Sequence, residues 1–217
     1  MEMHTLISRE TARHDIYKTL AECWHMPDQN MNTLLDTLVF QLTALDSKAC
    51  PHGEQMQVEL GQIDDNLLLG VEFTRLFIGP YSLPCPPYGS VYMEKNRAVM
   101  GDSTVDARKR YQDLGVDLAK NFKEVPDHIS VELEFMFLQV YKEIEYFQAD
   151  EPGLVQQMLL HQQSFLLDHL HRWIPEFAHG VDKHAGIAFY RLLADATRIF
   201  IEEECQYLEK ILVPVAQ

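Results

Sequence analysis

Apolar residues recur at helical spacing through most of this 217-residue chain. The clearest stripes lie within Leu34–Leu45, Leu133–Phe147 and Phe189–Phe200, where apolar side chains stand three to four positions apart. This spacing places them on one face of an α-helix, and hardly any stretch alternates as a half-buried strand does. The sequence therefore predicts an all-α fold.

Glycine, proline and polar clusters divide the chain into roughly eight to eleven helices. The predicted breaks are Met26–Asn30, Ala49–Gly53, Gly79–Gly89, Val125–Pro126, Asp150–Gly153 and Pro175–Gly180. We expect one globular helical bundle over residues 1–217, with a hinge near 121–130 that could join two lobes, 1–122 and 130–217. Expected helices flank this hinge at 103–120 and 131–148.

Charge and cysteine usage restrict the partners and the compartment. A net charge of −15 disfavours nucleic acid and anionic membrane surfaces and favours basic partners. The four cysteines form no CxxC pair, which suits reduced thiols. No run of 18 apolar residues suggests a membrane span. We expect a cytoplasmic protein that does not bind nucleic acid and is not an integral membrane protein.

The segment Arg75–Tyr92, RLFIGPYSLPCPPYGSVY, holds four prolines, two glycines and three tyrosines. Proline fixes its own φ and disfavours helix at the preceding residue, so this loop should be stiff and non-helical. Ordered loops on helical scaffolds often carry binding function. The segment is either a binding surface or a rigid connector packed on the core. The Cys85 thiol within it could be exposed.

Polar residues mark two further helix starts. Asp127 follows Pro126 and Asp102 follows Gly101, and each aspartate is expected as a helix N-cap, a position that could also face a groove. His128 is the group expected to change charge near neutral pH. Glu72 and Arg75, three apart on a helix, are expected to pair at the surface.

Histidines and an aspartate in the last third of the chain raise a second possibility, a metal site. The residues are His161, Asp168, His169, His171, His179 and His184. No HExxH motif accompanies them, which favours solvated helix surface over metal ligation. A metal-dependent helical hydrolase is the alternative function. Phosphate-loop and serine-hydrolase motifs are absent, and no catalytic dyad can be assembled from the sequence.

Three blocks taken together, the proline segment, GDST at 101–104 and EVPDH at 124–128, resemble the TorD/DmsD family of redox-enzyme maturation chaperones. Their order and spacing match from about Glu72 onward, and a late Phe189-Tyr190-Arg191 agrees. PPYGS and GDST lean toward the DmsD branch. Tyrosine stands at 81, 88 and 92, where close relatives tend to have tryptophan.

The resemblance implies an all-helical, non-catalytic chaperone of the cytoplasm. Such a protein binds the twin-arginine signal peptide of a molybdoenzyme of the DMSO or TMAO reductase type. It supports folding, cofactor insertion and proofreading before Tat export. The implied partners are the signal peptide and the apo-enzyme, with the Tat translocase or cofactor-biosynthesis proteins as further ones. The protein would be a monomer or a domain-swapped dimer. No cofactor is expected; GTP binding has been proposed in the family, but no phosphate loop supports it here.

The resemblance also carries over peptide-binding positions. They are Leu76, Phe77, Pro86, Pro87, Tyr88, Gly89, Tyr92, Gly101, Asp102, Asp127 and His128. A twin-arginine peptide is basic at its start and apolar in its middle, so its receptor needs carboxylates beside an apolar groove. We expect Asp127 to contact an arginine or the peptide backbone, with His128 orienting the hinge.

Overall fold

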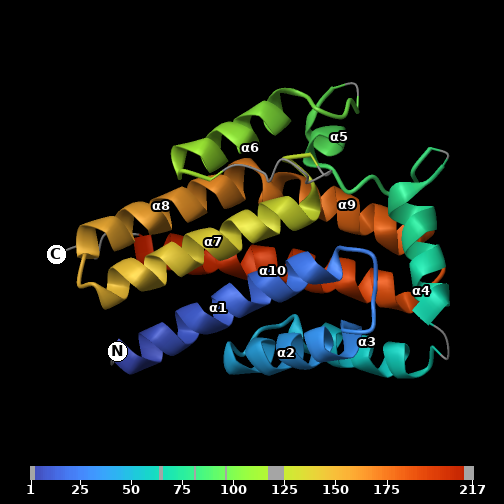
Figure 1. Cartoon of the computed structure of the whole chain (residues 1–217), viewed down its shortest axis with the longest axis horizontal. Coiled ribbons are helices and arrows are strands. Elements are labelled where there is room, and N and C mark those ends of the chain that lie inside the picture. Colours follow the sequence, from blue (N-terminus) through green and yellow to red (C-terminus); the bar gives the residue numbers. More distant parts are fainter. Residues whose placement is uncertain (1–2, 64–65, 81, 96, 117–124, 213–217) are drawn as a thin grey trace.

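The computed structural model describes residues 3–63, 66–80, 82–95, 97–116 and 125–212 (Figure 1). Ten α-helices and one π-helical turn lie in these ranges, and no strand is found there, so the all-α prediction and the expected number of helices are confirmed. The elements are α1 (Met3–Cys23), α2 (Met31–Ala44), α3 (Cys50–Gly61), α4 (Asn66–Phe73), η1 (Thr74–Ile78, the π-helical turn), α5 (Gly89–Met93), α6 (Asp102–Asp113), α7 (Ile129–Gln148), α8 (Pro152–Asp168), α9 (Leu170–His184) and α10 (Ala188–Leu212).

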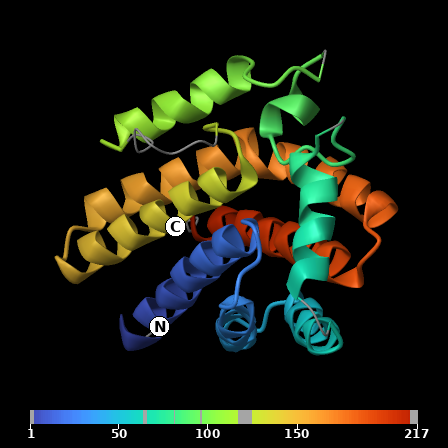
Figure 2. The same cartoon turned by 45° about the vertical axis from the view of Figure 1, so that its right-hand side comes forward.

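The long helices form the body of the bundle. Helix α7 packs between α1 and α8, and α10 packs against α3, α8 and α9 (Figure 1). Helix α4 stands across one end of the bundle, and α5 and α6 lie over α8 and α9 (Figure 2). Helices from both sides of the predicted hinge therefore contact each other. Residues 121–124 of that hinge lie outside the described ranges, and the division into lobes 1–122 and 130–217 stays a prediction.

The predicted apolar stripes supply the core. In α10, Phe189, Leu193, Ala196 and Phe200 are all buried. An aromatic cluster joins the turn after α1 to η1 and α9, because the ring of Trp24 lies 5.5 Å from that of Phe77 and 5.1 Å from that of Phe177. The indole N–H of Trp24 donates to Thr197 Oγ1 at 3.1 Å, so its polar atom is satisfied within the core.

The predicted break at Pro175–Gly180 is wrong, because α9 runs through it. Proline costs a helix the bond to the residue four positions earlier, and here that residue is only the second of the helix. A continuous buried face outweighs this loss; it consists of Leu170, Trp173, Ile174, Phe177, Ala178 and Val181. The chain breaks instead at His169, whose φ of −122° and ψ of −96° separate α8 from α9.

The predicted helix 103–120 is too long at its C-terminal end. Helix α6 stops at Asp113, and Gly115 takes a φ of +77°, a left-handed conformation that favours glycine and ends helices. Residues 117–120 lie outside the described ranges. The expected helix 131–148 is confirmed as α7.

The predicted ion pair of Glu72 and Arg75 is confirmed, but Glu72 is buried and does not lie at the surface. The pair also extends beyond one helix. Arg75 Nε donates to Glu72 Oε2 at 2.7 Å, and the N–H of Gly186 donates to Glu72 Oε1 at 2.5 Å. The bond from Arg75 lowers the pKa of Glu72, with burial opposing. Arg75 also donates to the carbonyl of His184 at 2.7 Å. The pair therefore ties α4 and η1 to the turn between α9 and α10.

A buried charge cluster joins four helices at the centre of the bundle. Arg13 of α1, fully buried, donates from Nε to Glu204 Oε2 at 2.8 Å and also contacts Glu10. Its Nη1 lies 3.4 Å from Glu143 Oε2, and its Nη2 donates to Gln162 Oε1 at 2.7 Å. One guanidinium therefore faces three shielded carboxylates from α1, α7 and α10.

This cluster makes stability depend on pH through Glu143. Burial raises the pKa of Glu143 to about 7, although the charge of Arg13 opposes the shift. An unfolded glutamate ionises near pH 4.3. The folded state therefore holds a proton that the unfolded state releases, and this stabilisation fades as pH rises from about 4.3 to about 7.

Glu143→Gln removes this dependence while keeping an acceptor for Gln162, whose Nε2 lies 2.6 Å from Glu143 Oε2. Relative to wild type, the variant should gain about 3 kcal/mol of unfolding free energy between pH 4.3 and pH 7.5, at 1.36 kcal/mol per pKa unit. Urea unfolding across this range measures the difference. Glu145→Gln, at an exposed position of the same helix, is the control. Parallel stability profiles for wild type and Glu143→Gln would contradict the assignment.

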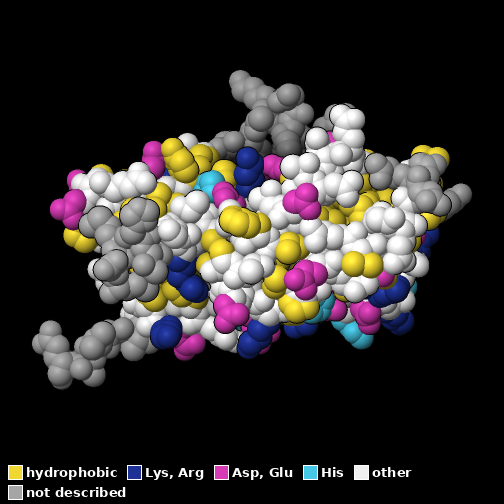
Figure 3. All heavy atoms as spheres, turned by 90° about the horizontal axis from the view of Figure 1, so that it is seen from below, with side chains coloured by type: hydrophobic (Ala, Val, Ile, Leu, Met, Phe, Trp, Pro, Cys, Tyr) yellow, Lys and Arg dark blue, Asp and Glu magenta, His cyan; other side chains and the backbone are white. Residues whose placement is uncertain are grey.

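The face formed by α1, α2 and α3 carries acidic, basic and hydrophobic side chains interspersed with one another (Figure 3). None of the helices in the described ranges combines the length and hydropathy that crossing a bilayer requires.

Candidate functional site

The proline segment and the EVPDH block meet at one junction. Tyr88 and His128 form an isolated antiparallel bridge. The N–H of Ile129 donates to the carbonyl of Pro87 at 3.0 Å, and the N–H of Gly89 donates to the carbonyl of Asp127 at 2.8 Å. The end of the proline segment is therefore held against the start of α7 by backbone bonds.

Asp127 strengthens this junction with its side chain. Its fully buried carboxylate accepts the N–H of Ser90 at 2.7 Å through Oδ2, while Oδ1 has no hydrogen-bond partner among the residues that the structure describes. The predicted N-cap role of Asp127 is wrong. His128 is the N-cap of α7, and its Nδ1 accepts the N–H of Ser130 at 3.2 Å. The carboxylate is directed instead at the free first-turn amides of the neighbouring helix α5.

His128 is shielded from solvent and does not change charge near neutral pH. Burial, with a smaller effect from His25, lowers the pKa of His128 to about 3. Its ring lies 5.4 Å from that of Tyr88 and 6.4 Å from that of His25. The sequence expectation for its titration is therefore wrong, because burial disfavours the charged imidazolium.

The GDST block joins the same assembly through Glu94. The Glu94 carboxylate accepts the N–H and the hydroxyl of Ser103 at 3.0 and 2.9 Å. Gly101 is the N-cap of α6, so the predicted N-cap role of Asp102 is wrong; the acceptor for the first turn comes from Glu94, outside the helix. A Cβ at Gly101 would lie 2.6 Å from the Glu94 side chain and would displace this carboxylate from Ser103.

Trp173 of α9 supports the proline segment from beneath. Its ring stacks on Tyr92 with centroids 5.7 Å apart, and its Nε1 donates to Glu132 Oε2 at 2.8 Å. A Cβ at Gly89 would lie 3.0 Å from the same Nε1, so the indole would have to shift to accommodate it. The absence of a side chain at Gly89 therefore allows α5 to lie directly on the indole.

Glu132 continues the buried polar network toward α6. His169 lies between two carboxylates, with Nε2 2.8 Å from Asp106 Oδ2 and Nδ1 3.4 Å from Glu132 Oε1. Burial lowers the pKa of His169, but Glu132 and Asp106 outweigh it and the net shift is upward. Burial raises the pKa of Glu132. The network holds α6, α7 and α9 in register beneath the junction.

Most of the predicted peptide-binding residues are shielded. The buried ones are Leu76, Phe77, Pro87, Gly89, Asp127 and His128; the half-buried ones are Pro86, Tyr88, Tyr92 and Gly101; and Asp102 is exposed. Tyr81 lies outside the described ranges. The structure thus brings the three blocks together, but largely as interior support. Their assignment to peptide binding stays a prediction.

Cys85 is fully buried, so the expectation that its thiol could be exposed is wrong. Burial raises the pKa of this thiol to about 11, which keeps it protonated at neutral pH. The N–H of Cys85 donates to the carbonyl of Leu76 at 3.2 Å, which folds the proline segment back onto η1 and turns the side chain into the core.

The C-terminal histidines do not assemble a metal site in the described part of the chain, where no three His, Cys, Asp or Glu side chains are placed to hold an ion. His169 is buried between two carboxylates and is not solvated surface, so that expectation is wrong for this residue. His184 Nδ1 lies 2.8 Å from the carbonyl of Gly180, and Asp168 Oδ2 accepts from Arg110 at 2.7 Å. The metal-dependent hydrolase has no support in this geometry.

Comparison with known proteins assigns the family. The profile of the family described as nitrate reductase delta subunit matches residues 28–179, more than half of the chain. The chain belongs to this family. A relative named Tat proofreading chaperone DmsD, from Salmonella typhi, is 30% identical over 143 residues, which cover 65% of this chain and 61% of that protein. A relative named Chaperone protein TorD, from a Psychrobacter species, is 28% identical over 212 residues, 92% of each chain.

A solved structure shares the fold. It is a crystal structure of a candidate redox enzyme maturation protein from Archaeoglobus fulgidus, with a TM-score of 0.53 and 26% identity over 89% of this chain and 93% of that one. The resemblance to the TorD/DmsD chaperones is confirmed by these relatives. Both names occur at similar identity, so the lean toward the DmsD branch stays a prediction. The chain spans about 61% of the length of the DmsD relatives that it matches.

Sequence reasoning missed the residues that support the junction. Glu132 lies on α7, Trp173 lies on α9 and His169 lies at the break before α9, so they meet only in the folded chain. One signal was available, because Trp173 is one of only two tryptophans in the sequence. A large aromatic ring with one polar atom tends to anchor a buried contact.

Proposed function

We propose that this protein is a cytoplasmic, non-catalytic chaperone that binds the twin-arginine signal peptide of a molybdoenzyme. It supports folding and cofactor insertion of that enzyme, and it delays export until both are complete. Family membership and the names of the relatives support the proposal. The partner is the signal peptide together with the apo-enzyme of a DMSO or TMAO reductase-type oxidoreductase.

One structural observation carries the proposal: three separate sequence blocks within residues 75–128 converge on one junction. Ser90 of the proline segment donates to Asp127 of the EVPDH block. Ser103 of the GDST block donates to Glu94, which follows the proline segment. The net charge of −15 suits a basic ligand, because it raises the rate of encounter and disfavours acidic competitors.

Asp127 belongs to this proposal first as a positioning residue. Its carboxylate is fully buried and holds Ser90, so it fixes the end of the proline segment on α7. Direct contact between Asp127 and a peptide arginine would require the junction to open. The second oxygen, Oδ1, would then accept from the guanidinium or from a backbone N–H of the peptide.

Calorimetric titration of the purified protein tests the function. The probes are a synthetic peptide with two consecutive arginines followed by about 12 leucine and alanine residues and the same peptide with two lysines. The arginine peptide should bind about ten-fold more tightly, because guanidinium groups pair bidentately with carboxylates and ammonium groups do not. Equal, weak affinity for both peptides would contradict the proposal.

Two substitutions separate the roles of Asp127. Asp127→Asn keeps an acceptor for Ser90 and should retain most of the affinity, whereas Asp127→Ala leaves a buried amide unpaired and should weaken binding about ten-fold. Asp182→Asn, at an exposed position of α9, controls for loss of one negative charge. Unchanged binding by a folded Asp127→Ala variant would remove the junction from the site.

A further inference from the structure

An apolar groove at one end of the bundle lies outside all eleven predicted binding residues. It has a volume of about 550 Å³ and lies between the α1–α2 connection and α4; its lining residues are Met26, Pro27, Leu67, Gly70, Val71 and Thr74. Three of the side chains are strongly exposed: Met26 by 48%, Leu67 by 68% and Val71 by 57%. Exposed apolar side chains gathered on one hollow mark a surface for a partner.

Helix α4 explains why this face is apolar. Its inner side places Leu69 and Phe73 in the core, yet its outer side also carries leucine and valine instead of charged residues. A surface helix normally has a polar outer face. The hydroxyl of Thr74 donates to the carbonyl of Gly70 at 2.9 Å, so this side chain needs no hydrogen bond from a ligand. The groove therefore suits an apolar segment.

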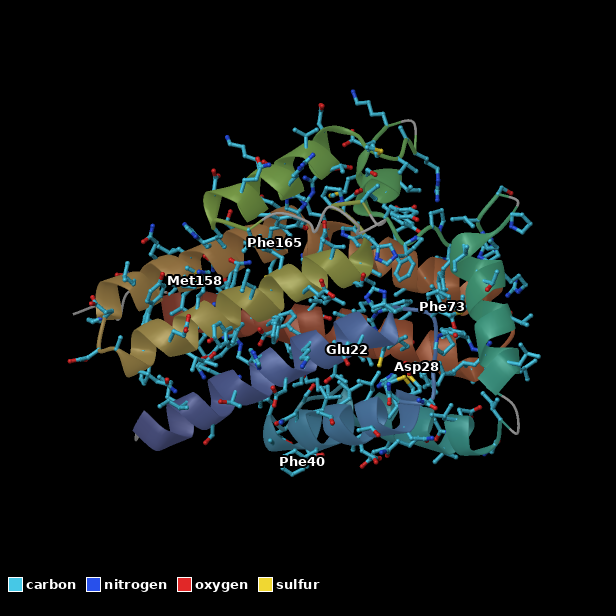
Figure 4. The ribbon with its side chains drawn as sticks, viewed as in Figure 1. Glu22, Asp28, Phe40, Phe73, Met158 and Phe165 are labelled. Carbon is cyan, nitrogen blue, oxygen red and sulfur yellow. The ribbon has the colours of Figure 1, made fainter. Side chains whose placement is uncertain are left out.

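Acidic side chains rim the same end of the molecule. Asp28 directly follows the groove residue Pro27, and Glu22 lies four residues before Met26, near the end of α1, with its carboxylate 4.0 Å from Lys18 Nζ (Figure 4). The carboxylate of Glu134 lies 3.9 Å from His25 Nε2. The cation nearest the groove along the chain, Arg75, is held by Glu72 at 2.7 Å. Lys18 faces Glu22 and Arg75 faces Glu72, so the excess negative charge beside the apolar hollow comes from Asp28 and Glu134.

We infer that this groove binds the apolar segment of the twin-arginine leader, with the arginines of the leader on the acidic rim; the inference rests on the proposed function. In this arrangement Asp127 would contact the backbone of the peptide and not its arginines. A leader of this kind joins basic residues directly to an apolar stretch. The acidic rim lies beside the apolar groove, just as the basic residues of the leader lie beside its apolar stretch. The volume accommodates several apolar side chains, which would make the groove the anchor of the peptide. Because η1 follows α4 directly, the rest of the peptide would extend toward the proline segment.

Substitution on both walls tests the groove. Met26→Ser combined with Val71→Ser removes two exposed apolar side chains, so folding should be unaffected. In calorimetric titration, the affinity for the arginine–leucine–alanine peptide described above should fall about ten-fold to a hundred-fold. This is the loss expected when two such side chains are no longer buried by the peptide. Leu160→Ser, at a 48% exposed position of α8, is the matched control and should leave affinity within about two-fold.

A charge cycle tests the rim. Asp28→Asn should weaken binding of the arginine peptide about three-fold to ten-fold and should leave a glutamine-for-arginine peptide unaffected. If wild type binds the arginine peptide and the Met26→Ser, Val71→Ser variant binds it equally, the groove is overturned and the proposed function stands. If wild type does not bind the peptide, both the groove inference and the proposed function are overturned. A wild-type dimer that this variant converts to a monomer, with peptide affinity unchanged, would assign the groove to a second copy and overturn the inference.

Discussion

Replacing Arg13 by methionine should lower the free energy of unfolding by about 3–5 kcal/mol, because the substitution leaves buried carboxylates without their cation. Arg13 is fully buried and contacts Glu10, Glu143 and Glu204, which are almost fully buried as well. For a chain of this size the loss corresponds to about 6–20 °C in the midpoint of thermal unfolding. Urea unfolding and differential scanning calorimetry measure it.

The matched control is Arg198→Met on the surface of α10. Arg198 also faces two carboxylates, with Nε 3.3 Å from Asp195 and Nη1 3.7 Å from Glu202, but its side chain is 35% exposed. An ion pair in contact with water contributes less than about 1 kcal/mol. Equal effects of the two substitutions would contradict the central role of the buried cluster.

Trp173→Ala should destabilise the protein by about 3–5 kcal/mol through the cavity that a buried tryptophan leaves. The indole is fully buried, stacks on Tyr92 and donates to Glu132. Its removal withdraws support from the proline segment as well as from α7. Peptide affinity should therefore fall along with stability, and both are measured on the same sample by urea unfolding and calorimetric titration.

Trp173→Phe separates packing from hydrogen bonding. The phenyl ring retains most of the aromatic contact but leaves Glu132 Oε2 without its donor, so the expected cost is about 1–3 kcal/mol. Phe177→Leu, a neighbouring aromatic-to-aliphatic change without a polar atom, is the control for altered packing. Trp173→Phe with the stability of wild type would show that the bond to Glu132 contributes nothing.

Helix positions followed from sequence wherever side-chain periodicity was strong. The stripe of Phe189, Leu193 and Phe200 became the buried face of α10, because burying one apolar face is the main source of helix stability. Proline was a reliable break between helices at Gly79–Gly89. It failed at Pro175, where the buried face of α9 outweighs one missing bond.

Helix starts were less predictable, because the capping acceptors come from distant segments. Asp127 accepts from Ser90 of α5, and Glu94 accepts from Ser103 of α6. A local pattern of an acidic residue before a helix cannot show that Glu94 already accepts from the first turn of α6, nor that the Asp127 carboxylate is directed at α5 while His128 caps α7. For the same reason, the burial of Cys85 was not visible in the composition of its loop.

Sequence by itself determined the all-α class, the stiff proline segment and the three blocks that indicated the family. These properties depend on neighbours a few residues apart or on motif order. Only tertiary structure decided that the proline segment is mainly interior support, that Arg13 meets carboxylates up to 191 positions away and that α4 presents an apolar groove. The physical reason is that burial and charge pairing depend on which helix faces pack together. The spacing of residues along the chain does not show which faces these are.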